Sequence, residues 1–140
     1  ITQQGQSAVF RTRGNKFGHI VLRGGGARTN YDSVSLALAE RELDKAGLPA
    51  NIVVDCSHGN SNKDHRNQPK VAADVASQIR AGNKAITGVM IESHLVEGRQ
   101  DVKPDQPLVY GQSITDACLG WDDSLRVLDV LSEAVKARRH

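Results

Sequence analysis

The feature that most constrains this chain is a repeated unit in which a short apolar run is followed by a segment with helical periodicity. Residues 19–22, 52–56 and 85–91 form such runs, and they are apolar nearly throughout instead of alternating with polar residues. Strands of this kind are typically buried on both faces in a parallel sheet covered by helices. The sequence therefore predicts an α/β protein, either a small doubly wound sheet or four consecutive units of a (β/α)8 barrel.

The predicted elements follow the order β-α-β-α-β-loop-β-α. A hairpin is predicted where Ala8–Phe10 and His19–Leu22 flank the turn signal Arg13-Gly14-Asn15. A short fourth strand is predicted over 112–115. We expect a single domain over residues 1–140, in which residues 1–22 form the hairpin and first strand and residues 23–140 form the remaining βα units.

Three helices are predicted, over residues 33–46, over 69–81 and from Asp122 onward. Asp32 suits the N-cap of the first helix because its side chain can accept from the first free backbone N–H groups. Gly47 suits the residue after that helix, where a left-handed backbone is common.

A polar or charged residue stands at the end of each predicted strand. These residues are Arg23, His58, Glu92 and Asp116. The carboxyl ends of parallel strands meet at one rim, so one functional side chain per unit would converge there. One imidazole and two carboxylates suit a divalent first-row metal, and an arginine suits phosphate or carboxylate. The pattern predicts a metal beside an anionic substrate.

Each of these residues also has a simpler interpretation when taken alone. His58 could be a structural hydrogen-bonding residue, Glu92 or Asp116 could cap the next helix, and Arg23 could pair with a nearby carboxylate. The glycine run 24–26 could let the backbone approach an anion or could be a plain turn. The four residues together favour the metal-site interpretation over its separate alternatives.

Composition excludes several classes of function. The 18 basic and 16 acidic residues give a net charge of +2 with signs interleaved, which argues against nucleic-acid binding. No apolar run approaches the roughly 20 residues that cross a bilayer, so no membrane partner is expected. Cys56 and Cys118 form no CxxC pair, which favours a reduced, cytoplasmic protein.

The chain begins at Ile1 with what reads as mid-domain sequence, and we expect a fragment of a longer protein.

Longer motifs around these positions resemble the class I 3-deoxy-D-arabino-heptulosonate-7-phosphate (DAHP) synthase family. In chain order they are Val21–Gly25, Lys45–Pro49, Val54–Lys63, Gly88–Gly98, Tyr110–Trp121 and Ala134–Arg139. The resemblance runs over essentially all 140 residues and corresponds to the C-terminal half of the family's barrel.

The resemblance implies an oligomeric (β/α)8 barrel enzyme that condenses phosphoenolpyruvate with erythrose 4-phosphate, giving DAHP and phosphate in the first step of the shikimate pathway. By position, His58, Glu92 and Asp116 match the family's metal ligands, and Arg23 matches an arginine that binds phosphoenolpyruvate. Arg23 and His58 are therefore the expected catalytic residues. Manganese, iron, cobalt or zinc would suit the ligands. An aromatic amino acid is a possible effector, because the N-terminal hairpin resembles a region near the family's effector pocket.

The chain also departs from the family pattern. The loop Gly26–Tyr31 is one residue longer than is common, and the family's fourth metal ligand, a cysteine, has no counterpart here. Neither have its lysine and further arginines for the two phosphates, so the isolated chain is predicted to be inactive. Two alternatives stay open. One is another metal-dependent barrel synthase or lyase acting on phosphorylated keto acids. The other is a non-catalytic half-barrel whose exposed strand edges associate with a partner.

Overall fold

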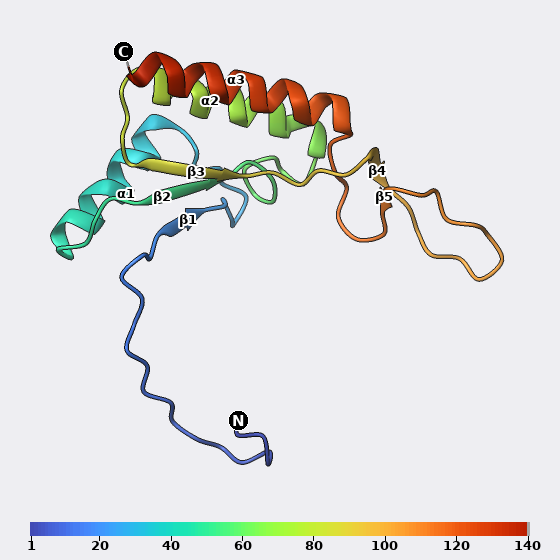
Figure 1. Cartoon of the computed structure of the whole chain (residues 1–140), viewed down its shortest axis with the longest axis horizontal. Helices are drawn as coiled ribbons and strands as arrows, with labels where there is room; N and C mark the ends of the chain where they lie inside the picture. The colour runs from blue at the N-terminus through green and yellow to red at the C-terminus, as the bar shows by residue number, and fades with distance from the viewer. Residues whose placement is uncertain (140) are drawn as a thin grey trace.

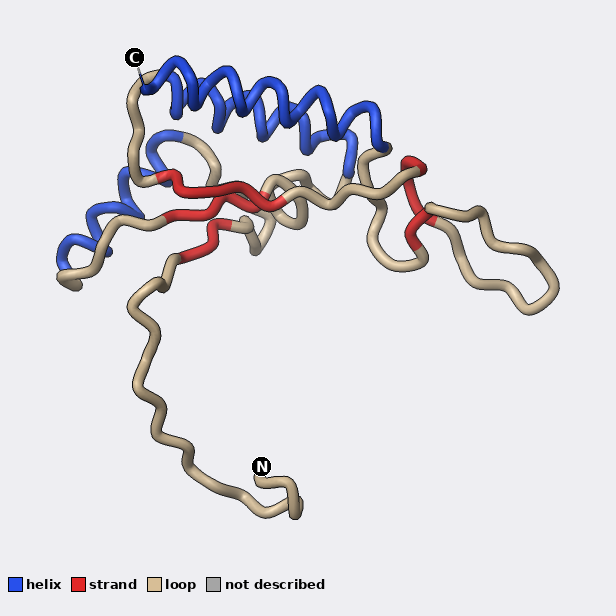
Figure 2. Tube along the Cα trace, in the orientation of Figure 1, coloured by secondary structure: helices blue, strands red, loops and turns tan. Residues whose placement is uncertain are grey.

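The computed structural model describes residues 1–139 and confirms an α/β architecture with parallel strands. The main sheet has three strands, β1 (Ile20–Leu22), β2 (Ile52–Asp55) and β3 (Ile86–Met90), in the order β1-β2-β3. Figures 1 and 2 show α2 and α3 side by side above this sheet, while the N-terminal residues run away from the body as a loop. Within the described chain, no helix has the length and apolar character needed to cross a membrane.

The helices are α1 (Ser33–Lys45), α2 (Gln68–Arg80), which follows the short 3-10 helix η1 (His65–Asn67), and α3 (Trp121–Arg139). Asp32 caps α1 as predicted, since its Oδ1 accepts from the backbone N–H groups of Val34 and Ser35 at 3.1 and 3.0 Å. The hydroxyl of Ser35 also donates to Asp32, and these hydrogen bonds lower the pKa of the Asp32 carboxyl. Gly47 follows the helix with a φ of 65°, which confirms its predicted left-handed conformation.

One face of the sheet carries the core. Paired positions of the three strands, such as Ile52 beside Ile86, point into a cluster to which all three helices contribute. Its fully buried members are Leu36, Ile52, Val54, Val75 and Ala134. The opposite face bears no helix among the described residues, and Val21 on it is 48% exposed. A doubly wound sheet has helices on both faces, so the one-sided cover is consistent with part of a (β/α)8 barrel.

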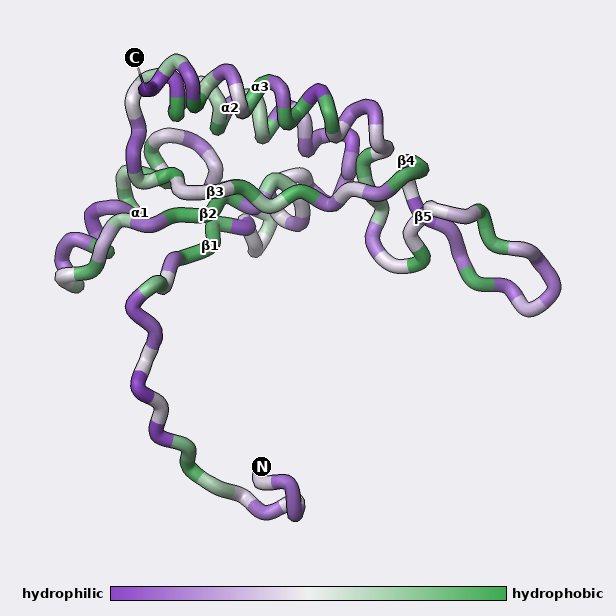
Figure 3. Tube along the Cα trace, in the orientation of Figure 1, coloured by the Kyte–Doolittle hydropathy of each residue, from purple (hydrophilic) through white to green (hydrophobic). Residues whose placement is uncertain are grey.

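The predicted N-terminal hairpin does not form. Within residues 1–139, Ala8–Phe10 belong to no strand, and β1 is reduced to Ile20–Leu22. Val9 and Phe10 are 93% and 69% exposed, and Figure 3 shows a short hydrophobic stretch within this otherwise largely polar segment. A two-stranded ribbon is marginal in water unless one face packs on something. The apolar run Ala8–Phe10 favours a strand locally, but it is exposed in the described chain and has no surface to pack against.

The predicted fourth strand forms in part, as β5 (Gln112–Ser113), but it does not join the main sheet. It pairs with β4 (Val96–Arg99), which lies in the predicted loop, in a separate two-stranded sheet. The sequence of β4, Val-Glu-Gly-Arg, is largely exposed and has no apolar run, so it gives no strand signal. The connection between β4 and β5 extends away from the body in Figure 2.

Candidate active site

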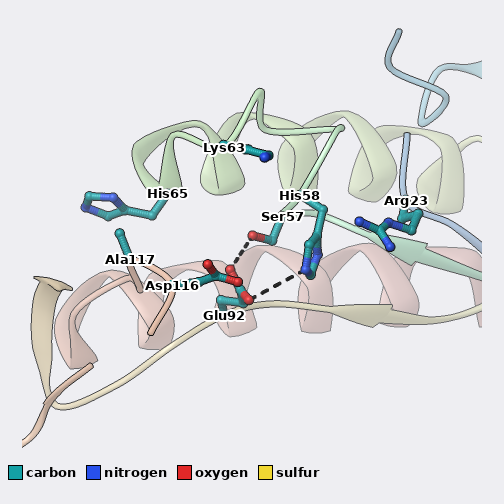
Figure 4. Close-up of a pocket in the computed structure, with 8 residues that line it drawn as sticks. All are labelled: Arg23, Ser57, His58, Lys63, His65, Glu92, Asp116 and Ala117. Atoms are coloured by element: carbon teal, nitrogen blue, oxygen red, sulfur yellow. Dashed lines mark hydrogen bonds and ion pairs between the residues drawn. The ribbon is translucent and has the colours of Figure 1, made fainter. Parts of the chain in front are cut away.

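The carboxyl ends of the three strands open onto a pocket of about 210 Å³. All four residues singled out from the sequence line it, and Figure 4 shows Arg23 on one side of His58 and the carboxylates of Glu92 and Asp116 on the other. The remaining lining residues, which the sequence analysis did not single out, are Ser57, Lys63, His65 and Ala117.

Three of these residues are arranged as a metal site would require. One ligand atom from each of His58, Glu92 and Asp116 lies within 4.8 Å of the others. Nε2 of His58 is 3.8 Å from Oε1 of Glu92. The His58 and Glu92 side chains are 30% and 22% exposed, so both reach the pocket without being fully solvated. A nitrogen and two carboxylates at this spacing fit a divalent transition metal.

Asp116 reaches this group by a route that the sequence did not reveal. It does not end a strand of the main sheet. Instead the chain just after it pairs in parallel with the residues that follow β3, where the Leu119 N–H donates to the Glu92 carbonyl at 2.9 Å and the His94 N–H donates to the Leu119 carbonyl at 2.9 Å. Asp116 is therefore carried to the side of Glu92 by backbone pairing three residues further on.

Arg23 is held near His58 by a close backbone approach between two loops. A Cβ atom on Gly59 would lie 2.6 Å from the Gly24 carbonyl carbon, and one on Gly24 would lie 2.7 Å from the Gly59 carbonyl carbon. Only glycine allows this distance. The contact joins the end of β1 directly to the turn that bears His58.

Asn60 ties the same region together. Its side chain is 3% exposed, and its Nδ2 donates to the carbonyls of Leu22 at 3.0 Å and Asp55 at 2.8 Å. Its Oδ1 accepts from the Asn30 N–H at 2.8 Å. One buried amide thus connects the ends of β1 and β2 with the loop after Arg23, and so sets the relative positions of Arg23 and His58.

The segment from Asp55 to Gln68, called the rim loop below, has an unusual backbone. His58, Asn62 and Lys63 adopt φ angles of 45°, 53° and 59°, in the left-handed region that non-glycine residues rarely enter. Such conformations carry a conformational cost and cluster at functional sites. The rim loop also supplies most of the new lining residues. Figure 4 shows Lys63 above Ser57 and His65 on the far side of the group from Arg23.

His65 is anchored by Glu97, since its Nε2 lies 2.9 Å from Glu97 Oε1. Neither His65 nor Lys63 follows a strand directly, so neither fits the pattern of polar residues at strand ends. Their only sequence signal is proximity to His58 in a polar loop. His94 is exposed and is not among the pocket-lining residues; its Nδ1 accepts from the Leu95 N–H.

Comparison with known proteins gives a consistent result. The profile described as the DAHP synthetase I family matches residues 1–129. The chain is 54% identical over 144 residues to the tyrosine-inhibited phospho-2-dehydro-3-deoxyheptonate aldolase of Schizosaccharomyces pombe, covering 99% of this chain and 38% of that protein. It is 52% identical over 139 residues to the Phe-sensitive enzyme of Escherichia coli, covering 99% and 39%.

The fold comparison agrees with the sequence comparison. A solved structure of phospho-2-dehydro-3-deoxyheptonate aldolase from Francisella tularensis matches with a TM-score of 0.90 at 44% identity, over 99% of this chain and 40% of that one. The chain therefore spans about two fifths of the length of the relatives it matches.

Proposed function

Because the chain belongs to the DAHP synthetase I family, we propose that its pocket is part of the catalytic centre of a DAHP synthase. The reaction joins phosphoenolpyruvate, erythrose 4-phosphate and one water to give DAHP and inorganic phosphate. The observation that carries the proposal is the convergence of His58, Glu92 and Asp116 within 4.8 Å, beside the cationic side chain of Arg23.

His58, Glu92 and Asp116 would hold the divalent metal. Their donor set suits manganese, iron, cobalt or zinc. Such a metal, when bound, supplies a Lewis acid for the aldehyde oxygen of erythrose 4-phosphate. The three side chains hold it at the rim, where their spacing is set by the backbone pairing of Glu92 with Leu119 and by the rim loop.

Arg23 would bind phosphoenolpyruvate. Its guanidinium is directed to the pocket in Figure 4 and stays charged at any working pH. A planar fork can hold a phosphate or carboxylate in two parallel hydrogen bonds, which orients the substrate as well as attracting it. The Gly24–Gly59 approach fixes this group relative to His58, so orientation of the anion is coupled to the metal ligands.

We expect the open face of the sheet to lie inside a complete (β/α)8 barrel, in an enzyme that forms a homo-oligomer. The exposed Val21 face and the two outer strand edges would be covered by the part of the barrel that corresponds to the rest of the relatives' length. We expect the fourth metal ligand and further anion-binding residues to lie in that part. The 140-residue chain by itself should therefore show no appreciable synthase activity.

The test is reconstitution. The chain is mixed with the separately produced segment of the Schizosaccharomyces pombe relative that precedes the matched region, and phosphate release is measured with both substrates and Mn²⁺. Activity should arise only in the mixture and should fall roughly 100-fold or more with His58→Ala. His94→Ala is the matched control, because this exposed histidine lies outside the pocket-lining set. Near-enzyme rates from the chain alone, or full activity with His58→Ala, would contradict the proposal.

The same assay separates the competing functions. Replacing erythrose 4-phosphate by arabinose 5-phosphate should abolish turnover in a DAHP synthase, whereas another barrel enzyme acting on phosphorylated keto acids would prefer a different pair. A mixture that associates without turnover would support the non-catalytic half-barrel instead. Sedimentation of the chain alone adds a check, because open strand edges should drive self-association.

Relatives named tyrosine-inhibited and Phe-sensitive suggest feedback control by an aromatic amino acid. We propose the same class of effector for the complete enzyme and leave its identity to inhibition assays with Phe, Tyr and Trp.

The two free thiols, Cys56 and Cys118, fit a cytoplasmic location.

A further inference from the structure

Asp55, the last residue of β2, shares a hydrogen bond with one ring nitrogen of His58. Its side chain is 4% exposed and uses both carboxylate oxygens. Oδ1 accepts from the Ser57 backbone N–H at 2.7 Å, and Oδ2 lies 2.9 Å from Nδ1 of His58. An ionised carboxylate only accepts hydrogen bonds, so Nδ1 of His58 is the donor in this contact. In the neutral imidazole that binds a metal, the lone pair is then on Nε2, which faces Glu92.

Ser57 engages one of the two carboxylate oxygens of Glu92. Its hydroxyl donates to Oε2 at 2.6 Å, while Oε1 is the oxygen that lies 3.8 Å from Nε2 of His58. The backbone of Glu92 is held separately by the fully buried side chain of Gln68, which donates to its carbonyl at 3.0 Å and accepts from its N–H at 2.8 Å. Glu92 is thus fixed at both its backbone and its carboxylate, with one oxygen left toward the pocket.

We propose that Asp55 and Ser57 are positioning residues that leave one metal-binding atom on each of two ligands, Nε2 of His58 and Oε1 of Glu92. The inference rests on the proposed metal site and extends it to two residues outside the proposed set of ligands. Ligand atoms fixed before the metal arrives lose less freedom on binding. Hydrogen-bond partners of metal ligands typically change metal affinity by about 10- to 100-fold.

The first experiment is titration of the purified chain with Co²⁺ alone, followed by its visible absorption. Asp55→Asn replaces one acceptor oxygen by a donor, so His58 and the Ser57 N–H cannot both be satisfied. Affinity should fall about 10- to 100-fold and the absorption band should change shape. Ser57→Ala releases Oε2 of Glu92 and should weaken binding by about tenfold, the lower end of the same range.

Asp64→Asn is the matched control for these variants. The Asp64 carboxylate also accepts a backbone hydrogen bond within the rim loop, from the Arg66 N–H at 3.0 Å, but its hydrogen bonds reach neither His58 nor Glu92. Its Co²⁺ affinity should equal that of the unmodified chain. An equal loss of affinity in Asp64→Asn and Asp55→Asn would overturn the proposal.

The second experiment needs no metal. Long-range ¹H–¹⁵N correlation spectra at about pH 8 show which ring nitrogen of His58 carries the proton. The proton should reside on Nδ1 in the unmodified chain and be shared with Nε2 in Asp55→Asn. If Asp55→Asn lowers only the melting temperature and moves neither the tautomer nor the Co²⁺ spectrum, Asp55 is merely structural and the proposal is wrong. Should Asp55→Asn not fold, unchanged affinity in Ser57→Ala overturns it.

Different results would contradict the metal site and the positioning roles of Asp55 and Ser57. His58→Ala with unchanged Co²⁺ affinity would remove the metal site itself. Loss of affinity in His58→Ala, together with unchanged affinity in Asp55→Asn and Ser57→Ala, would leave the site standing and remove only the positioning roles.

Discussion

The rim loop and the N-terminal segment, residues 1–19, are both irregular, yet they are held in very different ways. The rim loop has buried polar side chains that bond to other elements, as Asn60 does to the carbonyl of Leu22. Most of the N-terminal segment has only local contacts between exposed groups, such as the hydrogen bond from the Phe17 N–H to Asn15. A segment without regular structure becomes a site when its polar groups are satisfied by distant parts of the chain, and turn residues alone do not achieve this.

The largest expected effect tests the closest backbone contact of the rim loop. In Gly59→Ala the new Cβ would lie 2.6 and 2.7 Å from backbone atoms of Gly24 and Gly25, which have no flexible side chain to move away. Two loops must separate, and the free energy of unfolding should fall by about 3 kcal/mol. Urea unfolding followed by circular dichroism measures this change.

Gly25→Ala is the control for that substitution. It lies in the same contact region, but a Cβ there meets nothing within 4 Å of the described chain. The free energy of unfolding should change by no more than about 0.5 kcal/mol. Equal values for Gly25→Ala and Gly59→Ala would show that the two loops are not packed as closely as the structure places them.

A smaller but still large loss is expected from Asn60→Ala. The substitution leaves the Leu22 and Asp55 carbonyls and the Asn30 N–H without their partner in a buried region. An unsatisfied buried polar group costs about 1–3 kcal/mol, and we expect about 2–3 kcal/mol here in thermal unfolding. Asn15→Ala removes the exposed hydrogen bond that the Phe17 N–H donates to the Asn15 side chain, and it should leave the free energy of unfolding unchanged. Comparable losses would mean that burial does not distinguish the two regions.

Cys56 lies between Asp55 and Ser57 and is fully buried. The reactivity of its thiol therefore measures how well this part of the rim loop excludes solvent. Burial, and secondly the charge of Asp55, raise the pKa of its thiol from 9.0 to about 12. At about pH 8 only one thiol in roughly ten thousand would be ionised. Cys56 should therefore resist iodoacetamide in the folded chain, while the partly exposed Cys118 is labelled first. Mass spectrometry identifies the modified residue, and early labelling of Cys56 would show that the loop opens.

The sequence predicts features that depend on local patterns, and it does not predict those that depend on contacts with distant parts of the chain. Arg23, His58 and Glu92 are recognisable because each is a polar residue at most three positions beyond the end of an apolar strand, and parallel strands place such residues on one rim. The hydrogen bonds of Asp55, Ser57 and Gln68 with His58 and Glu92 cannot be predicted from the sequence. The sequence does not distinguish a polar side chain that faces water from one that bonds to a buried group. The hairpin predicted over Ala8–Leu22 does not form, for the converse reason. Its turn signal and apolar runs are local, but its stability depends on a surface to pack against.

The smallest expected effect is removal of residues 1–17. Val9 and Phe17 are 93% and 88% exposed, so their loss exposes little further apolar surface. The free energy of unfolding should change by less than about 0.5 kcal/mol, against about 3 kcal/mol for one added methyl group on Gly59. Thermal unfolding of the truncated chain makes the comparison. A loss above about 1 kcal/mol would mean that the N-terminal segment packs on the body or on a second copy, because only burial of its apolar side chains could contribute that much.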